Sequence, residues 1–233
     1  RDPLGNDFVV GPAGEFGMGP DTGNPSPVGY DEAPVGGTFL KIGAGERRKT
    51  GDDPYHFGHA YPLVSAPRWR IRWGASWMEW REEAATAAGW GYRYLKHLEI
   101  DGAGPAVTIR HALQNTGARG FRQTWYSHNF IRLDGLPIGT GYRLEFPFAP
   151  RLVRTVGDAV EARGDAIVYL RDLAPTEGMF AVVEGYGRDP AHHEVTVRCL
   201  TAAVRIAGDA PVHKLHVFAT GRTVCPELFV DLD

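Results

Sequence analysis

Short segments that alternate apolar and polar residues follow one another from residue 68 onward, and this repetition restricts the possible fold most strongly. They cover residues 69–73, 76–82, 91–100, 106–114, 121–132, 142–148, 166–171, 178–186, 193–200, 203–207, 213–220 and 224–232. Turn signals separate them, at Asp101-Gly102, Asn115-Thr116-Gly117, Asp134-Gly135, Gly139-Thr140-Gly141, Gly187-Arg188-Asp189-Pro190 and Gly208-Asp209. Strands at intervals of roughly ten residues, with no helices between them, are typical of an all-β sandwich or barrel.

We therefore predict an all-β, antiparallel fold in which the long strands 91–100 and 106–114 form a large curved sheet. One face of such a sheet packs on a second sheet, and the other can be concave and wet. The window 82–88 has a helix-forming composition but is short, so it is either a helix or a loop. A single domain over residues 1–233 is the simplest organisation, because sandwiches often use this length as one domain.

The first 37 residues are rich in Gly, Pro and Asp and show almost no periodicity. A loop of this length is unusual in a compact domain unless it has a function. It is either a surface arm wrapped on the sheet or the rim of a binding cleft, to which Glu15 or Tyr30 contributes. A short strand follows at 38–45, and the charge run 46–49 predicts a solvated loop.

Two histidines, His56 and His59, stand three residues apart. On a helix this spacing could chelate a metal ion, but Gly58 and Pro62 disfavour a helix. A metal site also needs further ligands, and the sequence offers none that can be placed here. We therefore predict no metal at this segment.

Charge and composition exclude several classes of partner. The net charge is −3 and no basic stripe occurs, which argues against nucleic acid. No apolar run is long enough to span a membrane, and no signal peptide is visible, so we expect a cytoplasmic protein. The sequence begins at Arg1 rather than Met, which leaves open a missing terminal strand at either end.

Cys199 and Cys225 could lie on neighbouring strands, but two buried free thiols are the favoured interpretation.

The segment from Gln123 to Arg132 carries polar groups in an aromatic strand. On a strand, Tyr126 and His128 point to one face and Asn129 points to the other. A histidine in this position is either a core residue whose ring nitrogens find partners or an acid or base that faces a ligand.

The last strand contains a second candidate, Glu227, among Pro226, Leu228 and Phe229. A carboxylate in an apolar strand needs a partner or a function, although a solvent-facing position on an edge strand is the alternative. Arg222, just before this strand, could anchor an anion or a hydroxyl. The aromatic side chains that suit a sugar face, or else the plain core, are Trp77, Trp80, Trp90, Trp125 and Tyr126.

The pattern "LQNTG…WYSHNF", followed near the C-terminus by "VCPELFVDL", resembles the galactose mutarotase-like, or aldose 1-epimerase-like, superfamily. Phe39-Leu40-Lys41-Ile42-Gly43 and Phe146-Pro147-Phe148 resemble an uncharacterised bacterial branch of it. The resemblance covers most of residues 28–232. It implies a β-supersandwich with a sugar-binding concave face, on which a histidine protonates the ring oxygen and a glutamate takes the anomeric proton.

By position, the resemblance assigns these two catalytic roles to His128 and Glu227. Mutarotases carry Asn-His-x-Tyr-Phe in the aromatic strand, whereas the order here is His128-Asn129-Phe130. They also carry an earlier histidine, for which His56 and His59 are candidates and Lys41 a cationic alternative. Some substrate-binding candidates rest on the chemistry of the residues alone, and others on the resemblance. Together they are Tyr126, Asn129, Lys41, Arg222, Glu15 and His59.

Three functions follow as hypotheses, all with a mono- or oligosaccharide as partner. The first is an aldose 1-epimerase-like enzyme. The second is a polysaccharide lyase or glycoside hydrolase on the same fold, since a fold does not fix a function. The third is a non-catalytic sugar-binding protein. None requires a cofactor, and neither a glycine-rich phosphate loop nor a serine elbow occurs. The sugar and the oligomeric state stay open.

Overall fold

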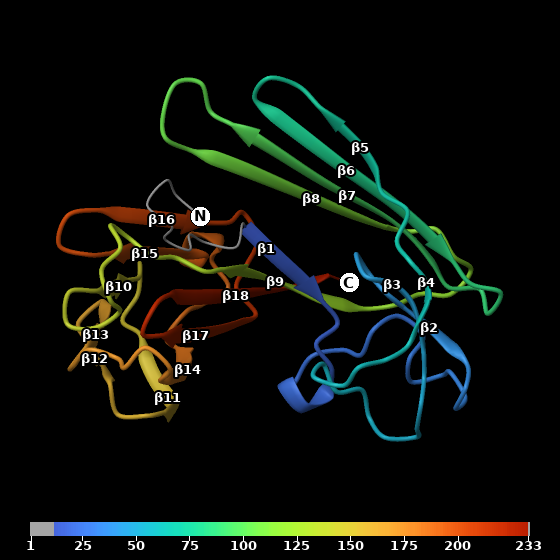
Figure 1. Cartoon of the computed structure of the whole chain (residues 1–233), viewed down its shortest axis with the longest axis horizontal. Helices are drawn as coiled ribbons and strands as arrows, with labels where there is room; N and C mark the ends of the chain where they lie inside the picture. Colours follow the sequence, from blue (N-terminus) through green and yellow to red (C-terminus); the bar gives the residue numbers. More distant parts are fainter. Residues whose placement is uncertain (1–11, 233) are drawn as a thin grey trace. The chain divides into compact units, whose positions relative to one another are not determined.

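A computed structural model describes residues 12–232, and Figure 1 shows that these residues are almost entirely β-structure. The prediction of an all-β antiparallel sandwich is confirmed. Two three-residue 3-10 helices, Pro20–Thr22 and Pro190–His192, are the helices of this part of the chain, and neither is long and apolar enough to cross a membrane.

The described residues fall into two compact units. The first holds residues 12–14 and Trp125–Asp231, and the second holds Glu15–Thr124 and residue 232. The sequence predicts a single domain.

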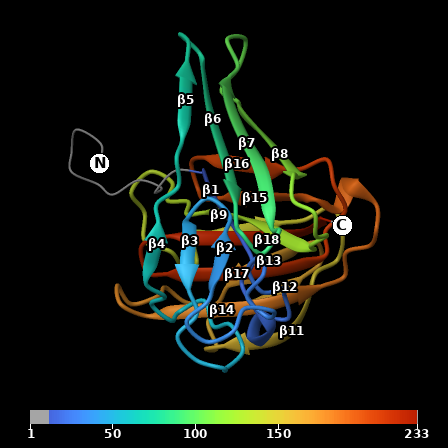
Figure 2. The ribbon, with the colours of Figure 1, turned by 90° about the vertical axis from the view of Figure 1, so that its right-hand side faces the viewer.

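Two antiparallel sheets form the first unit. The six-stranded sheet has the order β1-β9-β18-β17-β14-β11, and the five-stranded sheet has the order β12-β13-β10-β15-β16. Figures 1 and 2 show β14, β17 and β18 side by side. The strand bounds are β1 Pro12–Phe16, β9 Gln123–Asn129, β10 Arg143–Glu145, β11 Arg151–Val156, β12 Val160–Arg163, β13 Ala166–Tyr169, β14 Gly178–Glu184, β15 Glu194–Arg198, β16 Ala203–Ala207, β17 Lys214–Thr220 and β18 Val224–Leu232.

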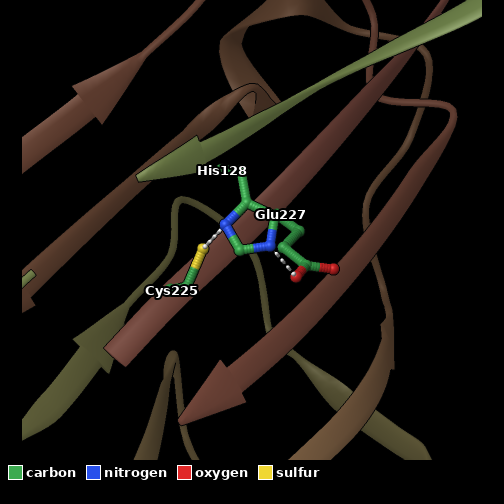
Figure 3. Close-up of side chains that lie close together, drawn as sticks. All are labelled: His128, Cys225 and Glu227. Carbon is green, nitrogen blue, oxygen red and sulfur yellow. Dashed lines mark hydrogen bonds and ion pairs between the residues drawn. The ribbon is translucent and has the colours of Figure 1, made fainter. Parts of the chain in front are cut away.

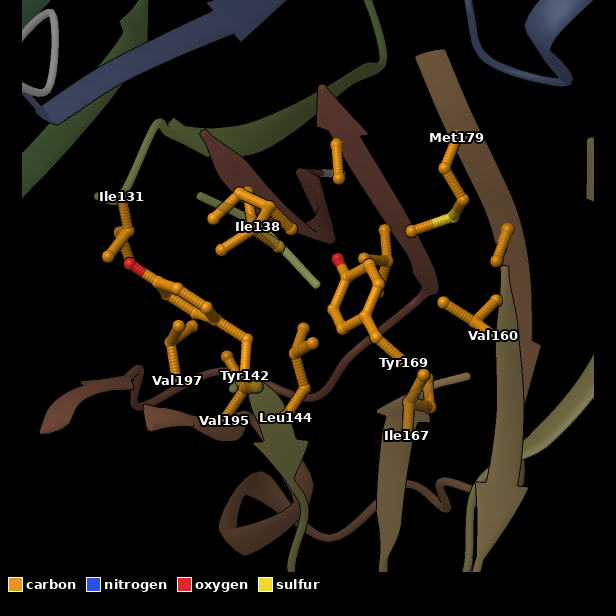
Figure 4. Packing of buried hydrophobic residues seen from close by; sticks show 14 of the residues in the cluster. Ile131, Ile138, Tyr142, Leu144, Val160, Ile167, Tyr169, Met179, Val195 and Val197 are labelled. Carbon is orange, nitrogen blue, oxygen red and sulfur yellow. The ribbon is translucent and has the colours of Figure 1, made fainter. Parts of the chain in front are cut away.

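A hydrophobic core draws on strands of both sheets and is shown in part in Figure 4. Strand β17 alternates so that Leu215, Val217 and Ala219 are buried in this core. From the five-stranded sheet, Leu144 and Ile167 join the same cluster. Burying such side chains contributes about 1.5–3 kcal/mol each relative to exposure. The side chains on the other face of the six-stranded sheet point away from this core.

The second unit contains two smaller antiparallel sheets. The three-stranded sheet has the order β2-β3-β4, and the four-stranded sheet has the order β5-β6-β7-β8. Their bounds are β2 Thr38–Lys41, β3 Gly45–Arg48, β4 Leu63–Ser65, β5 Arg70–Trp73, β6 Trp77–Ala85, β7 Gly91–Ile100 and β8 Val107–Asn115. A buried cluster of Tyr30, Phe39, Tyr55 and Tyr61 packs beside β2.

The four-stranded sheet has one apolar face and one charged face. Directly paired residues point to the same face, so the register groups the apolar side chains together. These are Ile71, Trp73, Met78, Trp80, Leu98, Ile100, Val107 and Ile109. Several are exposed, and Trp73 is 70% exposed. The opposite face carries ion pairs such as Arg110–Glu99, at 3.0 Å.

Two sequence-based predictions of non-strand structure were wrong. The charge run at 46–49 lies largely in β3, where Arg47 donates hydrogen bonds to the carbonyl oxygens of Ala44 (3.1 Å) and Tyr61 (3.2 Å). The window 82–88 is strand as far as Ala85, because β6 pairs with β7 along its whole length. The segment 55–64 is not helical, as predicted. Both cysteines are buried free thiols, also as predicted.

Candidate active site

Three neighbouring strands of the first unit place His128, Glu227 and His216 in one row. Strand β17 pairs His216 directly with Glu227 of β18. Ile131 and Val224 form an antiparallel bridge, and the register continued from this bridge sets His128 of β9 opposite Glu227. Leu215 and Val217, which flank His216, point into the core. The polar row therefore lies on the face of the six-stranded sheet that is turned away from that core.

Glu227 lies between the two imidazole rings. His128 Nε2 is 3.4 Å from Glu227 Oε1, and His216 Nδ1 is 3.6 Å from Glu227 Oε2. The side chains are 23%, 11% and 12% exposed for His128, Glu227 and His216. Each keeps some contact with solvent, so the row is partly accessible while its electrostatic interactions are stronger than in bulk water.

The other nitrogen of His128 faces the buried thiol of Cys225, as Figure 3 shows. The Cys225 Sγ is 3.4 Å from His128 Nδ1. A neutral imidazole that donates its Nε2 proton to Glu227 presents a bare Nδ1, which accepts the thiol proton. Burial, followed by the charge of Glu227, raises the pKa of the Cys225 thiol well above its usual range. Cys225 is therefore a protonated thiol at neutral pH.

Aromatic rings flank the polar row. Tyr126 stacks on Phe229 with ring centroids 4.6 Å apart, and Phe229 meets the His216 ring at 5.0 Å. Phe130 lies 4.4 Å from the His128 ring. Tyr126 and Phe229 are buried and Phe130 is partly exposed, so the row combines titratable groups with one accessible aromatic ring on the same face of one sheet.

Strand β18 also contains a proline beside this row. Val224 and Ile131 exchange both backbone hydrogen bonds, at 2.9 and 2.7 Å. In an antiparallel pair the next residue of β18 that faces β9 in this way is two positions on, and this residue is Pro226. Proline has no N–H group, so it donates no hydrogen bond toward β9 at this point.

Two further predicted residues lie in the first unit outside the row. Asn129 points to the opposite face of β9, and its buried Oδ1 has no hydrogen-bond partner among the described residues. Arg222 is exposed in the turn between β17 and β18, where its backbone N–H donates to Thr220 Oγ1 at 3.2 Å.

Lys41, Glu15 and His59 belong to the second unit. Lys41 Nζ donates to the carbonyl oxygens of Phe16 (2.6 Å) and Gly17 (2.8 Å) and pairs with Glu15 Oε1 at 3.0 Å. This lysine holds residues 15–17 of the N-terminal segment in place. His59 Nε2 lies 3.0 Å from Thr50 Oγ1.

Reasoning from sequence missed His216 and the role of Cys225. His216 stands between Leu215 and Val217 in the predicted strand 213–220, and this was a usable signal because a polar residue interrupts an apolar strand. Cys225 is two residues before Glu227, and this spacing places both on one face of a strand. The prediction that His128 and Glu227 act as catalytic residues stays a prediction.

Comparisons of the chain with known protein families, with curated proteins and with solved structures found no match.

Proposed function

We propose that this protein is a carbohydrate-active enzyme of the aldose 1-epimerase-like type, with His128 and Glu227 as its acid and base. The observation that supports the proposal is the approach of these two side chains to 3.4 Å on an aromatic-flanked face outside the core. A histidine and a glutamate from strands distant in sequence meet there, and their side chains are 23% and 11% exposed.

The distance between the pair suits chemistry at an anomeric carbon. Ring opening requires a proton on the ring oxygen and removal of a proton from the anomeric hydroxyl. Both oxygens are bonded to the same carbon, so an acid and a base on adjacent strands can reach them together. His128 gives the proton, Glu227 takes one, and the reverse transfers close the ring after rotation. His216, on the second carboxylate oxygen, positions Glu227.

The surroundings of the pair support a sugar as the ligand. The apolar face of a pyranose stacks on aromatic rings, and the partly exposed Phe130 flanks His128 on the same face, whereas Tyr126 is buried and stacks on Phe229. A glycoside hydrolase of the two-carboxylate type needs a second carboxyl group about 5–9.5 Å from the first. The neighbours of Glu227 in the row are imidazoles instead, which favours the epimerase over that alternative.

Anomer interconversion, followed by polarimetry or proton NMR on freshly dissolved aldoses and their phosphates, tests the proposal. Glu227→Gln and His128→Gln should each lower the rate by about 10²–10⁴-fold, the usual contribution of a general acid or base. Arg205→Gln, which removes an exposed ion pair with Glu194 on β15, is the matched control and should keep the full rate. Failure of the wild-type chain to accelerate any of these sugars would refute the proposal. Unchanged sugar affinity in the variants, without turnover in any form, would identify a binding protein instead.

A further inference from the structure

We propose that His128, Cys225 and Glu227 form a binding site for a zinc-like divalent cation. Each residue can offer one ligand atom, and these three atoms lie within 4.8 Å of one another. Among residues 12–232, this is the one group of three such side chains that meets in this way. The proposal does not depend on sugar turnover.

One of the observed distances matches a tetrahedral site, and the third ligand atom lies within 4.8 Å of the other two. Zinc bonds of about 2.0–2.1 Å to nitrogen and oxygen and about 2.3 Å to sulfur separate neighbouring ligand atoms by roughly 3.3–3.6 Å. The contacts of His128 with Cys225 and with Glu227 are both 3.4 Å. They involve opposite ring nitrogens, as Figure 3 shows, so the ion takes one nitrogen and the remaining ligand moves toward it. The flexible side chain of Glu227 allows this movement.

The donor set selects the kind of ion. A thiolate and an imidazole with a carboxylate are borderline-soft ligands that suit zinc, whereas magnesium and calcium prefer oxygen ligands alone. Cys225 loses its proton when it binds the ion, as every zinc-bound cysteine does. Three protein ligands leave a fourth position open, which distinguishes such a site from a closed structural one.

His216 provides the support that metal sites usually have. Its Nδ1 is 3.6 Å from the Glu227 oxygen that His128 does not face. Groups that hold a metal-binding carboxylate in place typically raise metal affinity 10–100-fold. The rings of Phe180 and Phe229, each 5.0 Å from His216, restrict water around this contact.

The metal site and the proposed reaction use the same side chains. A bound ion occupies the lone pairs with which His128 and Glu227 would move protons. Zinc therefore acts as an inhibitor of anomer interconversion, and a chelator restores the rate.

Cobalt(II) and zinc, each added to the reduced full chain, test the site directly. Tetrahedral cobalt bound to a thiolate gives a near-ultraviolet charge-transfer band, which the wild-type protein should show. Cys225→Ser should abolish the band, while Cys199→Ser, at the other buried thiol, should keep it. Absence of the band in the wild type, or its persistence in Cys225→Ser, would overturn the proposal.

Zinc affinity, measured by competition with a chromophoric chelator, gives the second readout. One ion per chain should bind, with affinity reduced at least tenfold in Cys225→Ser and about 10–100-fold in His216→Gln. Wild-type affinity in both variants would place the ion elsewhere. Lack of zinc binding with intact anomer interconversion refutes the metal site alone, whereas zinc binding without any turnover refutes the proposed reaction alone.

Discussion

The six-stranded sheet of the first unit and the four-stranded sheet of the second alternate in the same way but use their faces differently. In the first, residues such as Leu215 and Leu228 are buried in the core, and the opposite face holds His128, Glu227 and His216 among aromatic rings. In the second, one face carries exposed ion pairs, and the other leaves Trp73 and its apolar neighbours open.

The difference shows that alternation identifies two faces without telling which one is covered. Charged groups on the four-stranded sheet are paired at the surface, where an ion pair contributes about 0–1 kcal/mol. Those in the row of the six-stranded sheet are largely buried and contact one another, so each is constrained by its neighbours. Titratable groups placed this way are candidates for chemistry, whereas surface pairs are not.

A truncation in each sheet provides the largest test of this contrast. Leu228→Ala removes a fully buried side chain and should lower the free energy of unfolding by about 2–5 kcal/mol. Ile71→Ala, at a half-exposed position of β5, should cost less than about 1 kcal/mol. Urea denaturation with pulsed hydrogen exchange of β18 and β5 peptides measures both. Equal losses would show that the apolar face of the four-stranded sheet is covered as fully as the core.

Acid should weaken the four-stranded sheet. Burial, with the charge of Lys96, lowers the pKa of His111 to about 4, and Tyr94 Oη lies 2.8 Å from its Nδ1. Because the folded pKa is below the unfolded value, the unfolded chain takes up a proton first, and stability is lost as the pH falls from about 6.5 to 4. We expect a loss of about 1–3 kcal/mol relative to His111→Gln.

Tryptophan fluorescence during urea titration follows this unit, because five of the six tryptophans lie in it. Burial also raises the pKa of Glu82 in the same unit, and this acts in the opposite direction. The difference between the wild type and His111→Gln cancels that contribution. Identical pH profiles for the two proteins would contradict the prediction.

Alkali should weaken the six-stranded sheet instead. The raised pKa of Cys225 means that the unfolded chain loses the thiol proton first, so stability falls as the pH rises above about 8.5. The slope approaches about 1.4 kcal/mol per pH unit in the wild type and should vanish for this group in Cys225→Ser. Urea midpoints at pH 7.5 and 9.5 measure this slope, when they are followed by the hydrogen-exchange protection of peptides from β17 and β18. A Cys225→Ser profile as steep as the wild type would rule the thiol out as the cause.

Most of the strand pattern could be predicted from the sequence, because alternation and turn residues are local signals. The twelve strands predicted from residue 69 onward all occur, with shifts at their ends. Strand β11 was missed because a register irregularity between Leu152 and Arg154 breaks its alternation. Strand β3 was missed because its side chains are charged, and its stability comes from pairing with β2 and β4.

The candidate site was less predictable, for a reason of distance along the chain. The face of His128 on its own strand followed from the period of two. The contact of His128 with Cys225 could not be predicted, because these residues are 97 positions apart and strand order is not a local property. His216 entered the row only because β17 lies next to β18.

The proline in β18 has a consequence for how firmly the two sides of the site are held together. His128 lies on one side of the line between β9 and β18, and Cys225 and Glu227 lie on the other, with Pro226 between them. A missing donor at that line means that the Asn129–Pro226 pair holds at most one of the two ladder hydrogen bonds of a full pair, so separating the strands slightly there breaks fewer bonds. We infer that the gap between the donor atoms is adjustable at low energetic cost, so that one site can accommodate ligands of unequal size. Slow amide exchange throughout β9, next to this proline, would contradict the inference.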